Sequence, residues 1–229
     1  MQWKCIGCIH RNLCIIEMMG YNIDLHVHSR SSGDSDADPE ELILQAIRIG
    51  LHGIAFTEHY SFEASEHVQV LRETYRKEIM IFRGVEFSTA EGHCLIFGVN
   101  TDKLLSRYLP IVEVLHIVNQ HGGAVIPSHP YRGINSLGDI IKRTKGICAL
   151  EGYNGCNLHA FNIKAVETAT ALNIPFTGGS DAHDSLSVGL CYTAFSRRVN
   201  HDNFIDVLKS GNYHGVDTRK ISQVSFPYN

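Results

Sequence analysis

The chain has 229 residues, of which 44% are hydrophobic and 19% charged, an ordinary balance for one globular domain. Its formal net charge of -4 provides no broad basic field, so duplex nucleic acid is not an expected partner. No uncharged apolar run approaches the roughly 20 residues that cross a bilayer, and no membrane partner is expected. The N-terminal segment lacks the features of a secretory signal, which makes a cytoplasmic location the default expectation.

Apolar and amphipathic segments alternate along the chain. Residues 21–28 predict a strand, and residues 39–49 predict a helix, because Pro39 suits a first helical position and Glu40 favours the positive end of the helix dipole. The further expected elements are, in order, strand 53–59, helix 61–77, strands 80–88 and 93–99, helix 104–121, strand 124–129, short helix 136–145, strand 147–153, helix 157–173, strands 174–181 and 191–195, helix 201–210 and a last strand at 221–226.

This alternation indicates an α/β fold with a parallel sheet covered by helices. About seven β–α units in a chain of this length favour a closed, TIM-like barrel over an open sheet. We expect one barrel domain over residues 21–229, preceded by an extension over residues 1–20. The extension carries Cys5, Cys8, His10 and Cys14, which form either a zinc knuckle or part of an unstructured or artefactual leader.

Metal-type side chains stand at the ends of several predicted strands. His26 and His28 are two residues apart in the first strand, so both imidazoles point the same way. Asp181 and His183 repeat this spacing late in the chain, and other strand ends carry His59, Glu86 and His129. Active sites of barrels form where the carboxyl ends of the strands meet, so these side chains are expected to converge. Metal binding would also explain why the chain has 14 histidines.

Imidazoles and carboxylates without a thiolate suit zinc, manganese or iron. Seven strong ligands exceed what one ion needs, so we expect two or three divalent ions. Paired ions about 3.5 to 4 Å apart generate hydroxide near neutral pH and clamp the attacking and leaving oxygens of a displacement.

The motifs D-L-H-V-H-S, T-E-H, G-V-E, S-H-P and G-S-D-A-H occur in this order between residue 21 and about residue 196. In this order they resemble the PHP (polymerase and histidinol phosphatase) family of metal-dependent phosphoesterases. The resemblance implies a distorted (β/α)7 barrel with a di- or trinuclear metal site; family members include histidinol-phosphate phosphatases, nucleotide phosphatases and polymerase-associated domains. The implied metal ligands are His26, His28, His59, Glu86, His129, Asp181 and His183.

The sequence departs from the family pattern at two places. Many relatives have Ser-Asp-Gly after the first motif, whereas here the aspartate is displaced, with Asp34 the candidate ligand and Asp36 the fallback. The usual T-D-H-D motif ends in Tyr60, which leaves the role of its last aspartate unfilled. His93 is either a further ligand or a rim histidine without a metal.

Some polar side chains are candidates for substrate binding. Arg132, just after the S-H-P motif, and Arg30 are placed to grip a phosphate, with a surface salt bridge as the alternative for each. Residues 153–155 either contact substrate or form a polar turn.

The expected function is hydrolysis of a small phosphomonoester or short nucleotide by metal-activated hydroxide. An amidohydrolase-like barrel is an alternative, although such enzymes often use a strand-borne lysine, and Lys142 and Lys145 belong to a predicted helix. A PHP-type nuclease acting on short oligonucleotides is a second alternative. A non-catalytic barrel is disfavoured because no predicted ligand is missing. The sequence predicts neither the substrate nor the oligomeric state.

Overall fold

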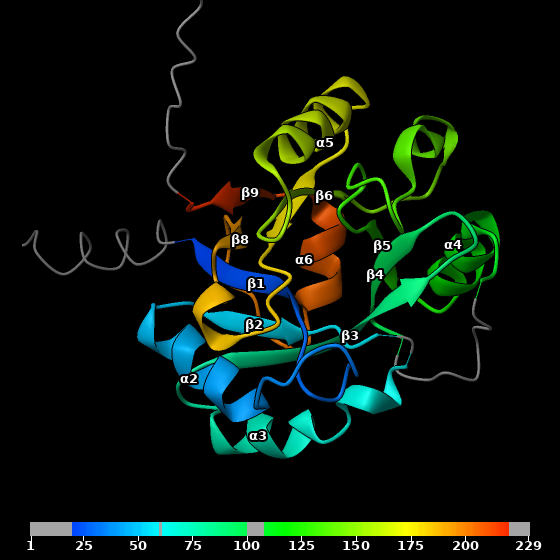
Figure 1. Ribbon diagram of the computed structural model, residues 1–229. Helices are drawn as coiled ribbons and strands as arrows, with labels where there is room; N and C mark the ends of the chain where they lie inside the picture. Colours follow the sequence, from blue (N-terminus) through cyan, green and yellow to red (C-terminus); the bar gives the residue numbers. More distant parts are fainter. Residues whose placement is uncertain (1–19, 60, 100–107, 220–229) are drawn as a thin grey trace, which may run out of the picture.

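The computed structural model describes residues 20–59, 61–99 and 108–219, which form one mixed α/β unit (Figure 1). Strand β1 (Tyr21–Val27) lies inside its main sheet, and its last five residues are buried. Because successive side chains of a strand point to opposite faces, the apolar Ile23 and Leu25 alternate with Asp24 and His26. One strand therefore supplies both core and polar site residues.

The main sheet has seven strands in the order β5-β4-β3-β2-β1-β8-β9, and β6 and β7 form a separate parallel pair. Each strand falls at a position that the alternating pattern predicted, except β9, which was not expected. The remaining strands are β2 (Gly53–Phe56), β3 (Met80–Ser88), β4 (His93–Phe97), β5 (Ala124–Pro127), β6 (Leu150–Asn154), β7 (Phe176–Gly179), β8 (Cys191–Phe195) and β9 (Tyr213–Asp217).

The described strand pairs do not form the expected closed, parallel (β/α)7 barrel. Only β1–β2, β2–β3 and β6–β7 pair in parallel, whereas β3–β4, β4–β5, β1–β8 and β8–β9 are antiparallel. A parallel pair needs a crossover of about a dozen residues. The turn over residues 89–92 between β3 and β4 is too short for one, so these strands form a hairpin. The result is a curled, mixed sheet rather than a regular barrel.

The segment after β7 nevertheless joins the end of β1. Ala182 forms a parallel bridge with Val27, and the backbone N–H of Asp181 donates to the carbonyl of His26 at 2.7 Å. The N–H of His28 donates in turn to the carbonyl of Ala182 at 2.9 Å. Two segments that are far apart in the sequence are thus locked together at the end of β1.

Helix α2 (Pro39–Arg48) agrees with its prediction. Pro39 lies at its start, and the side chain of Asp38 caps it by accepting the N–H of Glu40 at 2.8 Å. Its apolar face, with Leu42 and Ile43, packs in a buried cluster that also contains residues of β2. The helix therefore covers one face of the sheet, as Figure 1 shows.

Two long predicted helices are shorter in the structure. Residues 61–77 divide into a 3-10 turn, η1 (Glu63–Ser65), and α3 (Val68–Thr74). Arg83 donates to the carbonyl of Phe62 and to the hydroxyl of Ser65 in the first of these two pieces. Helix α4 (Ile111–Gln120) begins only after Pro110, which disfavours helical geometry in the residue before it.

Helix α6 (Phe204–Ser210) packs against the sheet through Phe204. Phe204 of α6 stacks on Phe82 with ring centroids 4.2 Å apart, and both lie in a core cluster that also contains Phe97. In Figure 1 the sheet curls around α6. The remaining elements are η3 (Gly138–Arg143), α5 (His159–Ala171) and η4 (Ser185–Ser187).

Several predictions fall outside the described residues. These are the Cys5, Cys8, His10 and Cys14 set, the start of the helix expected at 104–121 and the strand expected at 221–226. Within the described ranges, no helix is long and apolar enough to cross a membrane.

Candidate metal centre

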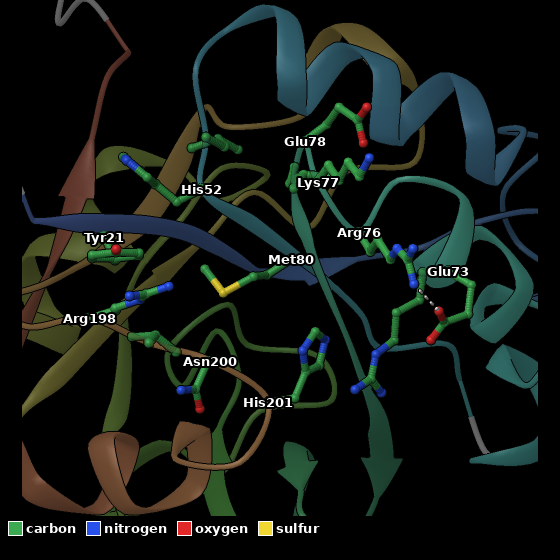
Figure 2. A pocket seen from close by; sticks show the side chains of 14 residues that line it. Tyr21, His52, Glu73, Arg76, Lys77, Glu78, Met80, Arg198, Asn200 and His201 are labelled. Atoms are coloured by element: carbon green, nitrogen blue, oxygen red, sulfur yellow. Dashed lines mark ion pairs between the residues drawn. The ribbon is translucent and has the colours of Figure 1, made fainter.

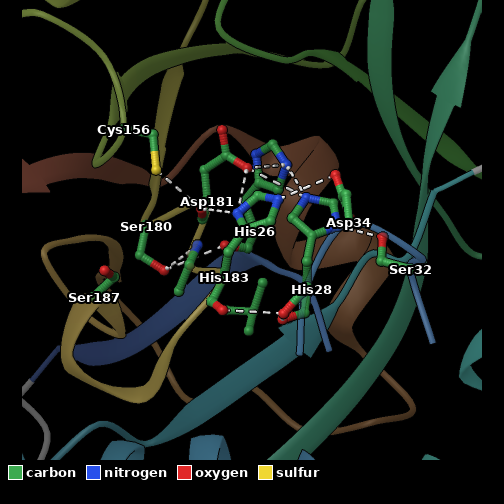
Figure 3. Close-up of polar contacts among 12 residues, drawn as sticks. His26, His28, Ser32, Asp34, Cys156, Ser180, Asp181, His183 and Ser187 are labelled. Atoms are coloured by element: carbon green, nitrogen blue, oxygen red, sulfur yellow. Dashed lines mark hydrogen bonds and ion pairs between the residues drawn. The ribbon is translucent and has the colours of Figure 1, made fainter. Parts of the chain in front are cut away.

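Four buried side chains form the first group of metal-type donors. His26 lies in β1 and His28 directly follows it, Glu86 lies in β3, and Asp181 follows β7. Their donor atoms lie within 4.8 Å of one another. The two Nε2 atoms are 3.0 Å apart, and each lies 3.3 or 3.4 Å from one oxygen of each carboxylate. Figure 3 shows both imidazoles and Asp181 pointing toward one another.

Glu86 also reaches a second group, which is made of histidines. Its Oε2 atom lies 3.4 Å from Nδ1 of His59, and its Oε1 atom lies 3.3 Å from Nδ1 of His93 and 2.7 Å from Nε2 of His129. Donor atoms of His59, Glu86 and His93 form a second set within 4.8 Å of one another. The Glu86 carboxylate therefore lies between two groups of donors, the position of a bridging ligand.

A third group lies nearer the solvent. The Oδ2 atom of Asp34 is 2.9 Å from Nε2 of His59 and 3.2 Å from Nε2 of His183, and His28 completes the set. Asp36, the fallback at this place, is exposed and belongs to none of the groups. The structure thus favours Asp34 over Asp36.

All the predicted ligands are brought together, including the two that the sequence left open. His129 contacts Glu86 directly, and the others belong to at least one of the three groups. The complete set is His26, His28, Asp34, His59, Glu86, His93, His129, Asp181 and His183.

Two of these side chains are aimed by unusual backbone geometry. His129 has a φ of 30° and Asp181 a φ of 56°, both in the left-handed region that residues other than glycine rarely adopt. The carbonyl of His26 holds the Asp181 N–H at 2.7 Å, and a carboxylate oxygen of Glu151 holds the His129 N–H at 2.6 Å. Such strain persists only where the surroundings enforce it, and it is common at functional sites.

Ser32 supports the histidines from outside the donor groups. Its hydroxyl lies 3.0 Å from Nδ1 of His28 and accepts the N–H of His59 at 2.9 Å. With Nδ1 engaged in this way, the Nε2 atom of His28 faces the carboxylates. Outer hydrogen bonds of this kind orient metal-binding histidines.

Arg132 is bound into the site more tightly than the sequence suggested. Its Nη2 atom donates to Oδ2 of Asp181 and, at 2.8 Å, to Oδ1 of Asn154, while its Nε atom donates to Oδ1 of Asn157 at 2.8 Å. The other Asp181 oxygen, Oδ1, faces His26 and His28. In the described part of the chain, only the Nη1 atom of Arg132 has no protein partner, so the guanidinium does not present a free two-pronged edge to a phosphate.

Arg30 forms the surface salt bridge that was its alternative interpretation. Its Nη1 atom lies 2.6 Å from Oδ2 of Asp38, the residue that caps α2, and the Arg30 side chain is 62% exposed. This contact stabilises the start of α2. A contact between Arg30 and substrate stays a prediction.

Sequence reasoning missed the buried polar residues behind the ligands, chiefly Glu151 and Asn157. Glu151 stands alone as a charge in an otherwise apolar predicted strand, and that signal would have identified it. Asn154, which the sequence placed in a turn or against substrate, is buried and bonds to Asp181, Arg132 and Glu151.

The buried carboxylates of the first group attract positive charge. Burial disfavours the ionised forms of Asp181 and Glu86, but the surrounding imidazoles, His26 first among them, together outweigh burial and hold the pKa of both carboxyls well below the ordinary range. Burial also opposes protonation of His28, yet Asp181 and Glu86 raise its pKa to about 9. The carboxylates are therefore ionised and attract a cation, which is a proton on the histidines when no metal ion is bound.

The donors fit divalent transition-metal ions. Two imidazole nitrogens face each other at 3.0 Å and share two carboxylate oxygens, while the buried Nδ1 atom of His129 has no hydrogen-bond partner among the described residues. A mixture of imidazole and carboxylate donors without thiolate suits zinc, manganese or iron. The carboxylate of Glu86 lies between two donor groups and could be shared by ions bound in each.

A separate hollow of about 430 Å³ lies at the other end of the strands (Figure 2). It is lined by Tyr21, His52 and Met80, at the start of the first three strands, and by cations such as Arg72 and Arg198. Because the donor groups lie at the opposite strand ends, this hollow is not part of the candidate metal centre.

A curled α/β sheet with histidine and carboxylate donors gathered at the ends of its strands defines the class of this protein. Residues 24–152 match the family model of the PHP domain, and residues 159–213 match that of the PHP-associated region. The first match spans more than half of the chain, and the chain belongs to the PHP family.

One protein of similar sequence and two solved structures of similar fold illustrate what this chain resembles. The uncharacterized protein MJ1587 of Methanocaldococcus jannaschii is 29% identical over 129 residues, which are 52% of this chain and 73% of that protein. PsfC from Pseudomonas syringae has a TM-score of 0.67 at 23% identity, covering 88% of this chain and 93% of PsfC. The lesion-specific endonuclease PfuEndoQ from Pyrococcus furiosus has a TM-score of 0.63 at 20% identity. The match covers 86% of this chain and 57% of PfuEndoQ. At these identities the structural likeness shows a shared fold only.

Proposed function

We propose that this protein is a metal-dependent phosphoesterase that hydrolyses a small phosphomonoester or a short nucleotide. The observation that carries the proposal is the bridging position of Glu86 between two groups of buried histidines, in a chain of the PHP family. A third group at Asp34 and His183 makes room for three ions as well as two.

Each group of donors has a distinct place in the proposed site. His26, His28 and Asp181 would hold the most buried ion, and His93 and His129 would share Glu86 with it from the other side. The third group, built on Asp34, His59 and His183, would hold the outermost ion. When bound, such ions would place positive charge beside the phosphate oxygens. They would also lower the pKa of a bound water molecule to about 7.

The side chains themselves determine where a phosphate approaches. His26, His28 and Glu86 are buried, whereas the side chains of Asp34 and His183 are 44% and 34% exposed. Substrate therefore reaches the cluster from the side of the third group. Arg132 lies behind Asp181 and has Nη1 available for one phosphate oxygen, while its other donors keep Asp181 in place.

A hollow of about 320 Å³ beside His93 suits the organic part of a small ester. Its described lining is polar and includes Ser88, Glu91 and Ser136, together with the ring of Tyr108. Hydroxyl and carboxylate groups of this kind would bind a hydroxylated or basic leaving group.

The alternatives have weaker support. An amidohydrolase-like site with a bridging lysine is disfavoured, since Lys142 lies in η3 and pairs with Asp139, and Lys145 follows that element, so neither stands at a strand end. The fold is shared with the endonuclease PfuEndoQ, which keeps a nuclease acting on short oligonucleotides as the second candidate. The net charge of -4 argues against duplex binding, because phosphate contacts by lysine and arginine dominate that affinity.

A panel of phosphorylated metabolites and short oligonucleotides, assayed with Mn²⁺, Zn²⁺ and Fe²⁺ separately, tests the proposal. Phosphate release from small esters should depend on the metal and disappear in a Glu86→Gln variant. Cleavage of oligonucleotides without activity on any monoester would replace the proposal by the nuclease alternative. A protein that binds none of the metals would overturn both.

A further inference from the structure

Strand β6 contributes none of the predicted metal ligands among the described residues, yet it carries a buried carboxylate. Glu151 is 1% exposed and is the second residue of β6, between Leu150 and Gly152. Burying a carboxylate costs several kcal/mol unless hydrogen bonds compensate. The partners of Glu151 therefore show why it is there.

Each oxygen of Glu151 holds a different predicted ligand. Oε1 lies 2.7 Å from Nδ1 of His26, and Oε2 accepts the backbone N–H of His129 at 2.6 Å. Oε2 also accepts from the amide of Asn154 at 2.9 Å. One side chain of β6 is thus bonded both to a ligand at the end of β1 and to a ligand after β5.

The contact with His26 fixes which nitrogen of the imidazole faces the donor groups. An ionised carboxylate can only accept hydrogen bonds, so Nδ1 of His26 is the donor. The Nε2 atom then points to His28, Glu86 and Asp181 and can offer a lone pair to a metal ion.

The pair packs closely against the backbone of β7 at Gly179. A Cβ atom added at Gly179 would lie 2.4 Å from Cβ of His26 and 2.9 Å from Oε1 of Glu151. Glycine at this position in β7 lets the backbone approach the imidazole and its carboxylate partner. The ring of His26 is consequently held between β7 and Glu151.

The hydrogen bonds continue from Glu151 to a third ligand. The Asn154 amide that donates to Glu151 also lies 3.2 Å from Oδ2 of Asp181, and its Oδ1 atom accepts from Arg132 at 2.8 Å. Arg132 donates to the same Asp181 oxygen. The side chains on β6 therefore direct Oδ1 of Asp181 toward the histidines.

We infer that Glu151 is a positioning residue of the metal centre, which acts through His26 and His129 and, by way of Asn154, through Asp181. The inference rests on the proposed function, because it assumes that these residues hold metal ions. It assigns to β6 a role in ordering the ligands, although β6 supplies no ligand itself.

A Glu151→Gln variant tests the inference, with metal binding as the readout. Glutamine keeps the shape but has one accepting oxygen, so either His26 or the N–H of His129 must lose its partner. Loss of an outer hydrogen-bond partner typically weakens metal affinity about 10- to 100-fold. We expect a loss of this size for Co²⁺ in the full-length protein, together with a change in the visible absorption spectrum of the bound ion.

Glu58→Gln is the matched control. Glu58 is also a buried carboxylate beside the site, but its side chain accepts from the N–H and hydroxyl of Ser29 and from none of the predicted ligands in the described contacts. Its variant should bind Co²⁺ with unchanged spectrum. Wild-type affinity and spectrum in Glu151→Gln, or equal losses in both variants, would overturn the inference.

Two further measurements cover the remaining outcomes. If Glu151→Gln does not fold, proton NMR of the metal-loaded wild type replaces it: the Nδ1–H of His26 should give an exchange-protected signal, and its absence would overturn the inference. Failure of the wild type to bind Co²⁺, Mn²⁺ or Zn²⁺ would instead overturn the proposed function, and the inference with it.

Discussion

The Oε1 atom of Glu86 lies 2.7 Å from Nε2 of His129, while its Oε2 atom lies 3.4 Å from Nε2 of both His26 and His28. The carboxylate is 1% exposed and belongs to β3, so the sheet holds it rigidly between the two sets of histidines. A side chain in this position can share its two oxygens between neighbouring ions.

Replacement of Glu86 by glutamine should therefore weaken the binding of more than one ion. Glutamine offers one neutral oxygen in place of two charged ones, and the buried imidazoles around it would lose their shared partner. Elemental analysis of the purified variant should show at least one ion fewer per chain than the wild type, with no measurable phosphatase activity. Equal metal content and turnover in the two proteins would contradict a bridging role.

Asp34 and Asp36 form a natural pair for comparison. Asp34 contacts His59 and His183, whereas Asp36 is exposed and outside the three donor groups. Asp34→Asn should lower turnover at limiting metal by at least the roughly 10- to 100-fold that loss of an outer partner costs. Asp36→Asn should behave like the wild type. If Asp36→Asn were the impaired variant, the assignment of the third group would be wrong.

The convergence of the predicted ligands could be foreseen in part from the sequence because strand geometry is local. His26 and His28 stand two residues apart at the end of β1, so strand geometry aims both imidazoles the same way. The same spacing recurs at Asp181 and His183, but Asp181 lies beyond β7 with a φ of 56°, so there the spacing located the residues without determining their geometry. The choice between Asp34 and Asp36 could not be made in this way, because it depends on how the segment before α2 folds back on His59.

The closed barrel was predicted but not found, and the residues behind the ligands were missed, for a different reason. Hydrophobic periodicity locates strands but does not say whether neighbours run parallel, and β4–β5, β1–β8 and β8–β9 pair antiparallel where a parallel barrel was expected. The hydrogen bond between His26 and Glu151 joins residues 125 positions apart. No local pattern indicates such a pair, although a lone charge in an apolar strand marks one of its members.

Arg132 and Arg30 should differ sharply when each is replaced by alanine. The guanidinium of Arg132 holds Asp181, Asn154 and Asn157, so Arg132→Ala should weaken metal binding and lower kcat in addition to raising KM. Arg30 pairs with Asp38 at the protein surface, where such pairs contribute only about 0 to 1 kcal/mol. Steady-state kinetics at saturating metal check this prediction, and a pure KM effect in Arg132→Ala would mean that it serves substrate alone.

Metal removal should change how the stability of the protein depends on pH. In the absence of metal the pKa of His28 is raised from an ordinary value of 6.5 to about 9, because Asp181 and Glu86 outweigh the effect of burial. Below pH 6.5 the imidazole is protonated in both the folded and the unfolded chain, and its contribution to stability is fully present. Between pH 6.5 and 9 only the folded chain keeps the proton, so this contribution is lost as the pH rises through that window.

The Tm of the chelator-treated protein should therefore fall from pH 6.5 to 9. Bound metal ions need neutral imidazoles and replace the proton, so the metal-loaded protein should show a much flatter profile over the same range. His214→Gln, a change at an exposed histidine outside the donor groups, should leave both profiles as in the wild type. Thermal unfolding followed by circular dichroism measures all three. A Tm that stays constant or rises in the metal-free protein would show that the imidazoles of the cluster are not protonated in the absence of metal.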